Sequence, residues 1–445
     1  MDMKKTFLAV PLSLSLLIPT AADVVNAEDH KMTPTVDTAA VDLRAQLDNL
    51  LSEHAYLAVE TMRKGAEGAA DFEASANALA GNTEDLSAAI ASVYGKEAGE
   101  QFKTMWSEHI GYFVDYVKAT GANDEEAKQM ALDELNQYRQ DFSQFLEGAT
   151  GERLEAGALA EGLQMHVNQL IGAFDAYVAG DYETAYMKER EAIKHMYGVS
   201  KGLSSAIVDQ FPDKFNNTKA VTPAADLRSN LNHLLSEHAG LAMMAMQNGI
   251  DGSEDYDASV QALNNNTEDL TAAISSIYGE EAGMKFKEMW SDHIGNFVAY
   301  VEGTGASDEE KKQMALDELE AYQQNFAEFL STATEGGLPA DVLAGNLGEH
   351  VDLLINTFDS YTAEDYEMTY ETLRESYAHM FMAGKALSGG FVAQFPDKFQ
   401  ADMPSEMPDT GMGGTAGMNM DLWIFASILA LMGAAGIFIR KQKQQ

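Results

Sequence analysis

Hydrophobic residues recur at helical spacing along most of the chain. One row runs through Leu43, Leu47, Leu50, His54, Leu57 and Thr61, with steps that alternate between four and three residues. This spacing places the row on one face of an α-helix. Alternating strand-like patterns are missing, and proline is absent from the interiors of the helical stretches. The pattern predicts an all-α protein.

Glycines and polar residues break the first part of this pattern into separate helices. Asp71, Asp124 and Asp181 stand at such breaks, where N-cap residues belong. We expect an up-and-down bundle of about six helices, near residues 41–64, 71–93, 96–119, 124–147, 156–179 and 182–209.

The second half of the chain repeats the first with a constant offset of 184 residues, and both halves end in Gln-Phe-Pro-Asp-Lys-Phe. A period this long indicates duplicated domains, because solenoid units are much shorter. The sequence predicts two tandem helical bundles, at 41–215 and 225–399, joined by a linker at 216–224.

Eight of the ten histidines obey the same offset. Each lies in a hydrophobic row near the middle of its predicted helix. At a rise of about 1.5 Å per residue, four imidazoles would therefore lie near one level in the core of each bundle. The predicted layers consist of His54, His109, His166 and His195 in the first repeat, and His238, His293, His350 and His379 in the second.

A layer of buried imidazoles needs a partner for each ring nitrogen, which favours a ligand site over simple packing. The chain has no cysteine, so an all-nitrogen site points to copper or another divalent transition metal. Haem held between pairs of histidines is an alternative, and so is a structural or adhesive surface spacer with packing histidines. Side chains that could orient the ligands are Glu191, Glu375, Tyr138, Tyr322, Thr83 and Thr267.

Catalytic motifs give little support for an enzyme. Neither a Gly-x-Ser-x-Gly sequence nor a phosphate-binding loop occurs. The histidine-bearing repeats resemble Gram-positive surface proteins labelled copper amine oxidase, but the Asn-Tyr pair and the His-x-His motif of that enzyme are missing. The resemblance therefore implies copper without the oxidase activity. We expect a binding protein with no catalytic residues, and a copper-dependent oxidase is an alternative that no motif supports.

The formal net charge of −41 argues against a nucleic-acid partner, because such a protein must neutralise phosphates with Lys and Arg. Residues 1–27 combine a basic start, an apolar run and small residues before Ala27. This arrangement predicts a cleaved signal peptide and export.

The C-terminal region contains a second predicted targeting signal, in addition to the signal peptide. A spacer at 400–420 precedes an apolar stretch at 421–439, long enough to span a membrane, and a basic tail at 440–445. The spacer resembles the Leu-Pro-any-Thr-Gly cell-wall sorting signal of Gram-positive surface proteins, through Met407, Pro408, Asp409, Thr410 and Gly411. The resemblance implies that sortase cleaves after the threonine and joins it to peptidoglycan, after transient anchoring by the membrane helix. We expect an extracellular protein of the cell wall or membrane surface.

Overall fold

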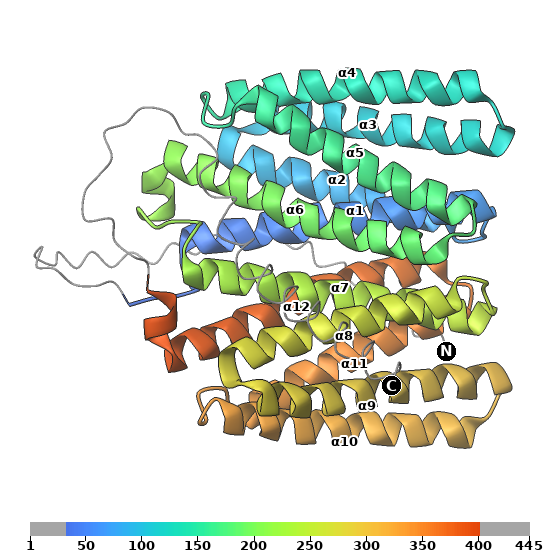
Figure 1. The fold of residues 1–445 in the computed structure, drawn as a ribbon, viewed down its shortest axis with the longest axis vertical. Helices are drawn as coiled ribbons and strands as arrows, with labels where there is room; N and C mark the ends of the chain where they lie inside the picture. Colours follow the sequence, from blue (N-terminus) through green and yellow to red (C-terminus); the bar gives the residue numbers. More distant parts are fainter. Residues whose placement is uncertain (1–32, 401–445) are drawn as a thin grey trace, which may run out of the picture. The chain divides into compact units, whose positions relative to one another are not determined.

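The computed structural model describes residues 33–400, which are all-α as predicted. The first repeat contains α1 (Ala39–Glu67), α2 (Phe72–Tyr94), α3 (Lys96–Ala122), α4 (Glu125–Ala149), α5 (Ala156–Val178), α6 (Tyr182–Gln210) and η1 (Pro212–Phe215). The second contains α7 (Pro223–Asp251), α8 (Tyr256–Tyr278), α9 (Glu280–Ala306), α10 (Glu309–Ala333), α11 (Ala340–Thr362), α12 (Tyr366–Gln394) and η2 (Pro396–Phe399). Equivalent helices have equal lengths (Figure 1).

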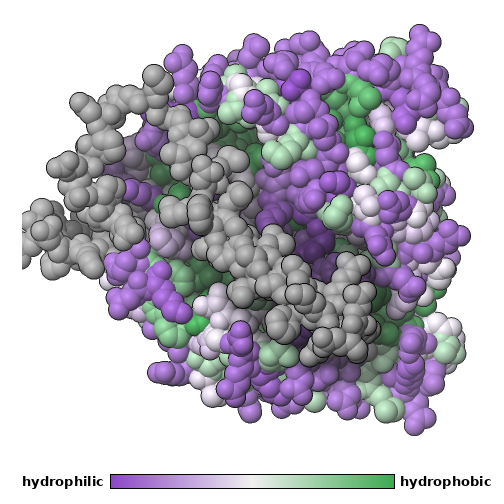
Figure 2. All heavy atoms as spheres, viewed as in Figure 1, coloured by the Kyte–Doolittle hydropathy of each residue, from purple (hydrophilic) through white to green (hydrophobic). Residues whose placement is uncertain are grey.

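The predicted signal peptide, sorting signal and membrane helix lie outside the described residues. Within residues 33–400, none of the helices has the length and apolar character needed to cross a membrane. Hydrophilic side chains cover most of the described surface visible in Figure 2, in keeping with the large negative charge.

Polar side chains begin several helices as the sequence predicts. The carboxylates of Asp124 and Asp181 accept hydrogen bonds from backbone N–H groups in the first turns of α4 and α6. Asp71 also stands just before its helix, α2, but its carboxylate caps nothing. It instead contacts Lys64 and Tyr370. Asp71 therefore occupies the predicted N-cap position, but its side chain does not make the capping hydrogen bond.

Helix α1 is the central helix of the first repeat, since it contacts α2, α3, α5 and α6 as well as α7 of the second repeat. Its residues are buried on nearly every side from Leu50 to Lys64. Helix α7 has the equivalent place in the second repeat. In Figure 1 these two helices lie between the α3–α4 pair and the α9–α10 pair. The single hydrophobic row predicted for α1 therefore understates its burial.

The two repeats meet through reciprocal ion pairs. Arg44 of α1 pairs with Asp226 of α7 at 2.6 Å, and Arg228 of α7 pairs with Asp42 of α1 at the same distance. Both arginines, and both aspartates, are 184 residues apart. Exchanging the repeats thus reproduces the same contacts, so the repeats are related by a pseudo-two-fold axis.

A second reciprocal set lies further along the same helices. Arg190 of α6 pairs with Glu237 of α7 at 2.9 Å, and Arg374 of α12 pairs with Glu53 of α1 at 3.0 Å. Each glutamate is almost fully buried and directly precedes a predicted layer histidine, His54 or His238. A single hydrophobic cluster also contains residues of both repeats, among them Leu57 and Leu241. The two repeats therefore share a hydrophobic core, in addition to being joined by the linker.

The pseudo-symmetry breaks where α1 and α7 cross. Tyr56 packs against Gly240, its own counterpart in the second repeat. A Cβ atom on Gly240 would lie 2.8 Å from the tyrosine ring. Because a second tyrosine would not fit there, the first repeat cannot pair with a copy of itself in this arrangement.

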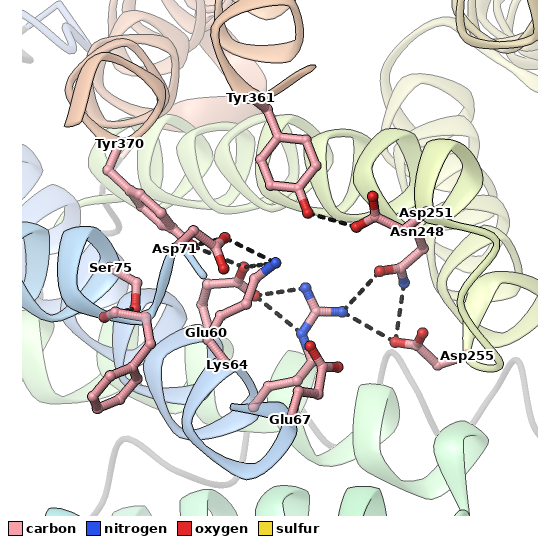
Figure 3. Close-up of polar contacts among 12 residues, drawn as sticks. Glu60, Lys64, Glu67, Asp71, Ser75, Asn248, Asp251, Asp255, Tyr361 and Tyr370 are labelled. Atoms are coloured by element: carbon pink, nitrogen blue, oxygen red, sulfur yellow. Dashed lines mark hydrogen bonds and ion pairs between the residues drawn. The ribbon is translucent and has the colours of Figure 1, made fainter. Parts of the chain in front are cut away.

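Charged side chains also gather at this interface, away from solvent. Lys64 pairs with Asp71 at 2.9 Å, and the Tyr370 hydroxyl donates to both Asp71 and Glu60 (Figure 3). Arg63 lies beside them and reaches into the second repeat, where its guanidinium bonds Asp255 at 3.0 Å. The equivalents of Glu60, Arg63 and Lys64 in the second repeat are Met244, Gln247 and Asn248. The charges of this cluster thus belong mainly to the first repeat.

Candidate metal centre

Three of the four predicted histidines meet in the core of each repeat. In the first repeat, His54, His109 and His166 each offer one ring nitrogen, and these nitrogens all lie within 4.8 Å of one another. They come from α1, α3 and α5. The second repeat brings His238, His293 and His350 together in the same way. These two groups, called here the histidine triads, could each hold a metal ion.

The fourth histidine of each predicted layer lies beside its triad but is engaged elsewhere. The Nε2 atom of His195 lies 3.0 Å from the carbonyl oxygen of Gly162, and that of His379 lies 3.0 Å from the carbonyl oxygen of Asn346. In both repeats, these bonds tie the last helix to the helix before it. The triads, whose ring nitrogens converge, do not include His195 or His379.

Aromatic rings enclose the triad. The Trp106 ring lies 4.7 Å from the His54 ring and 4.6 Å from the His109 ring, measured between centroids. Tyr138 stacks on the ring of His109, at a centroid distance of 4.8 Å and an interplanar angle of 16°. Trp290 and Tyr322 repeat these contacts in the second repeat. The rings therefore hold the imidazoles in place and keep water from most of their surface.

Several imidazole nitrogens of the triads have no hydrogen-bond partner among the described residues. In the first repeat these include Nδ1 of His54 and both nitrogens of His166. The same atoms of His238 and His350 are unpaired in the second repeat. An unpaired buried polar group costs about 1–3 kcal/mol. Packing alone therefore does not account for His166 and His350, whereas a bound ion would use the lone pair of one nitrogen of each.

Burial keeps the triad histidines neutral. It lowers the pKa of His109 to about 3, and it lowers the pKa of His54 and His166 well below the usual value, with the neighbouring imidazoles adding to the effect. In the second repeat, burial lowers the pKa of His293 and His350 to about 3. Neutral imidazole is the form that binds metal, so the triads are in the binding form at neutral pH.

One distance in the first triad suits a metal ion. The two Nε2 atoms of His54 and His109 are 3.4 Å apart. Metal–nitrogen bonds of about 2.0–2.1 Å in tetrahedral geometry place neighbouring ligand nitrogens about 3.3 Å apart. A hydrogen bond would normally be shorter than about 3.2 Å. The pair therefore fits an ion better than it fits a direct hydrogen bond.

Haem fits this arrangement less well. A porphyrin between two axial imidazoles needs their nitrogens about 4 Å apart, as well as a slot as wide as the macrocycle. The His54–His109 distance is too short for this, and Trp106 and Tyr138 occupy the neighbouring space. The site therefore favours a single ion over haem.

The predicted orienting side chains have different positions. Glu191 is exposed and pairs with Lys188, and Glu375 is also exposed. Neither glutamate is hydrogen-bonded to the histidine one turn further along its helix. Thr83 and Thr267 donate their hydroxyls to carbonyl oxygens in their own helices. Of the predicted set, only Tyr138 and Tyr322 contact triad rings directly.

Trp106 and Trp290 were not among the site residues predicted from the sequence, yet each contacts two triad histidines. Their spacing held the signal, because Trp106 lies three residues before His109 and so shares its helix face. The charged interface cluster was also missed. The sequence did carry a sign of this cluster, because the second repeat has uncharged residues at the positions equivalent to Glu60, Arg63 and Lys64.

Comparison of the chain with protein-family models, with curated proteins and with solved structures gives no match. The functional argument therefore rests on the fold and the two triads.

The Tyr138 hydroxyl is buried without a partner among the described residues. Because phenylalanine removes this unpaired group and keeps the ring that stacks on His109, Tyr138→Phe should raise the free energy of unfolding by about 1 kcal/mol. Chemical denaturation of the metal-free protein measures the change. Tyr116→Phe is the matched control, since the Tyr116 hydroxyl donates to Asp175, and it should be destabilising. Equal losses in the two variants would contradict the prediction.

Proposed function

We propose that this protein binds one transition-metal ion in each repeat, through the histidine triads, at the outer surface of a Gram-positive cell. The observation that carries the proposal is the convergence of three buried, neutral imidazoles in each repeat, among which both ring nitrogens of His166 and of His350 have no hydrogen-bond partner among the described residues. Capture, storage or relay of the ion is the corresponding role, and no catalytic step is part of it.

Copper is the favoured metal. The donors are imidazoles, without thiolate or carboxylate, and this set suits copper and zinc. Copper binds nitrogen sites more tightly than the other divalent first-row metals do. When bound, the ion would be held by His54, His109 and His166 in the first repeat, and by their equivalents in the second.

The location and the partners follow from the two ends of the chain. The signal-peptide pattern supports export, and the resemblance of 407–411 to a sorting signal supports joining to peptidoglycan by sortase. The acidic surface would concentrate cations near the protein. Metal binding by an exported protein at the cell surface is consistent with the signal peptide, the sorting signal and the acidic surface.

Metal titration of the chelator-treated protein tests the proposal. With copper(II), and with zinc(II) in parallel, we expect one ion per repeat. Copper(II), a paramagnetic ion, should also quench tryptophan fluorescence, because Trp106 and Trp290 touch the triads. His109→Ala removes one of only three ligands, so the affinity of the first repeat should fall by more than about 100-fold. Equilibrium dialysis with metal analysis gives the stoichiometry.

His195→Ala is the matched control. Because the ring nitrogens of His195 do not converge with those of the triad, this variant should still bind one ion per repeat. Undiminished binding by a His109→Ala/His293→Ala double variant, or no stoichiometric binding by the parent protein, would refute the metal site. The second outcome would favour a structural spacer in which the histidines only pack.

A further inference from the structure

A cleft lies against the histidine triad of the second repeat. It is narrow and partly open to solvent. His238 and His293 line it together with apolar side chains of α7, α8 and α9, and Asn264 on α8 completes the lining. Met246, Leu263 and Phe297 are representative of the apolar wall. Two of the three proposed ligands of this repeat, each only 1% exposed, therefore line this cleft.

Three protein ligands leave a position on a metal ion open. Four-coordinate ions with three histidines usually take a water molecule or an external ligand as the fourth partner. In the second repeat, Trp290 lies 4.7 Å from the His238 ring, and Tyr322 lies 4.7 Å from the His293 ring. These aromatic rings confine the space around the ion, so a ligand that reaches it must be small.

The chemistry of the cleft also limits the charge of such a ligand. None of the residues that line it is Lys or Arg. An anion would enter an apolar passage without a compensating cation, in a protein of net charge −41, and desolvation makes this costly. A neutral molecule meets neither obstacle.

We propose that the cleft admits a small neutral ligand, of the size of carbon monoxide, nitric oxide or dioxygen, to the open position of the metal ion in the second repeat. This inference rests on the metal binding proposed above. It adds a ligand class and a route of entry to that function.

Carbon monoxide is the probe, and copper(I) is the metal. The full chain carrying His109→Ala, which confines tight binding to the second repeat, is loaded with copper and reduced with ascorbate under anaerobic conditions. Infrared spectroscopy detects the bound carbon monoxide, and stopped-flow mixing gives its association rate. Copper content is measured separately on the same sample.

Two neighbouring substitutions test the route. Asn264→Trp places a large ring on the cleft wall, and we expect it to slow carbon monoxide association by at least about tenfold. Asn265→Trp is the matched control, because Asn265 is also exposed on α8 but does not line the cleft. It should leave the rate unchanged.

The outcomes separate the two proposals. A slower rate in the Asn264→Trp variant alone supports the cleft as the route. Equal rates in the two variants, or bound copper that takes up no carbon monoxide, overturn this inference and leave the metal site intact. Failure to bind copper overturns both.

Discussion

Without metal, the protein should lose most of its free energy of unfolding as the pH falls from about 6.5 to about 5. All six triad histidines have a pKa in the folded state far below the unfolded value of about 6.5. Above about pH 6.5 neither state carries these protons. Below it only the unfolded chain takes them up, so stability falls with pH until the folded pKa is reached.

The magnitude of this effect is large compared with ordinary protein stability. Each histidine costs about 1.4 kcal/mol per pH unit in this range, or about 2 kcal/mol at pH 5. The six together reach about 12 kcal/mol, and a whole domain is stable by only about 5–15 kcal/mol. We therefore expect acid unfolding of the metal-free protein near pH 5.

Two buried carboxyl groups act in the opposite direction. Burial raises the pKa of Glu189 to about 8 and that of Asp48 to about 6. Their folded-state pKa lies above the unfolded value, so they add stability as the pH falls towards about 4. Between pH 7 and pH 5 they recover about 4 kcal/mol. This gain is smaller than the loss from the histidines, so the histidines decide the direction.

Urea unfolding at a series of pH values, in the presence of a chelator, measures the effect. His166→Leu is the informative variant, because neither ring nitrogen of His166 has a partner to lose. It should reduce the dependence on pH by one proton, about 1.4 kcal/mol per pH unit. A free energy of unfolding that stays constant from pH 6.5 to pH 5 would show that the histidines are not buried as neutral groups.

Much of the fold could be predicted from the sequence because the signals were local. Helical periodicity and the glycine breaks placed the helices, and the offset of 184 residues predicted the equal lengths of equivalent helices. The histidines lie in the same hydrophobic rows, so their burial followed from the same pattern. Periodicity states which face of a helix is inside, and this was enough to predict that imidazoles would meet.

Hydrophobic periodicity does not predict which residue of a neighbouring helix a buried side chain will contact. His195 has the spacing expected for the predicted histidine layer, but its Nε2 atom is hydrogen-bonded to the carbonyl oxygen of Gly162 in α5. The burial of α1 on several sides also escaped the pattern, because the second repeat covers the face that carries Arg63 and Lys64. A contact between segments that are distant in the sequence does not produce a periodic pattern within either segment, so it cannot be predicted in this way.

Replacing Arg63 with alanine should be among the most destabilising single changes at the interface. The guanidinium bonds Glu60 at 2.8 Å and Asp255 at 3.0 Å, and all three side chains are almost completely buried. Although burial alone would favour the neutral carboxyl, Arg63 and Lys64 keep the pKa of Glu60 below its usual value. Arg63→Ala leaves two carboxylates with too little positive charge, which typically costs about 3–5 kcal/mol. Urea unfolding at pH 7 measures the loss.

The exposed pair of Lys103 and Glu84 supplies the control. Because solvent screens that pair, Lys103→Ala should cost less than about 1 kcal/mol. The double variant Glu60→Met/Arg63→Gln gives the first repeat the residues that the second repeat has at these positions, Met244 and Gln247. It removes both partners of the closest ion pair, so it should lose less stability than Arg63→Ala does. If the double variant is the less stable of the two, the destabilisation comes from lost packing and not from unpaired buried charge.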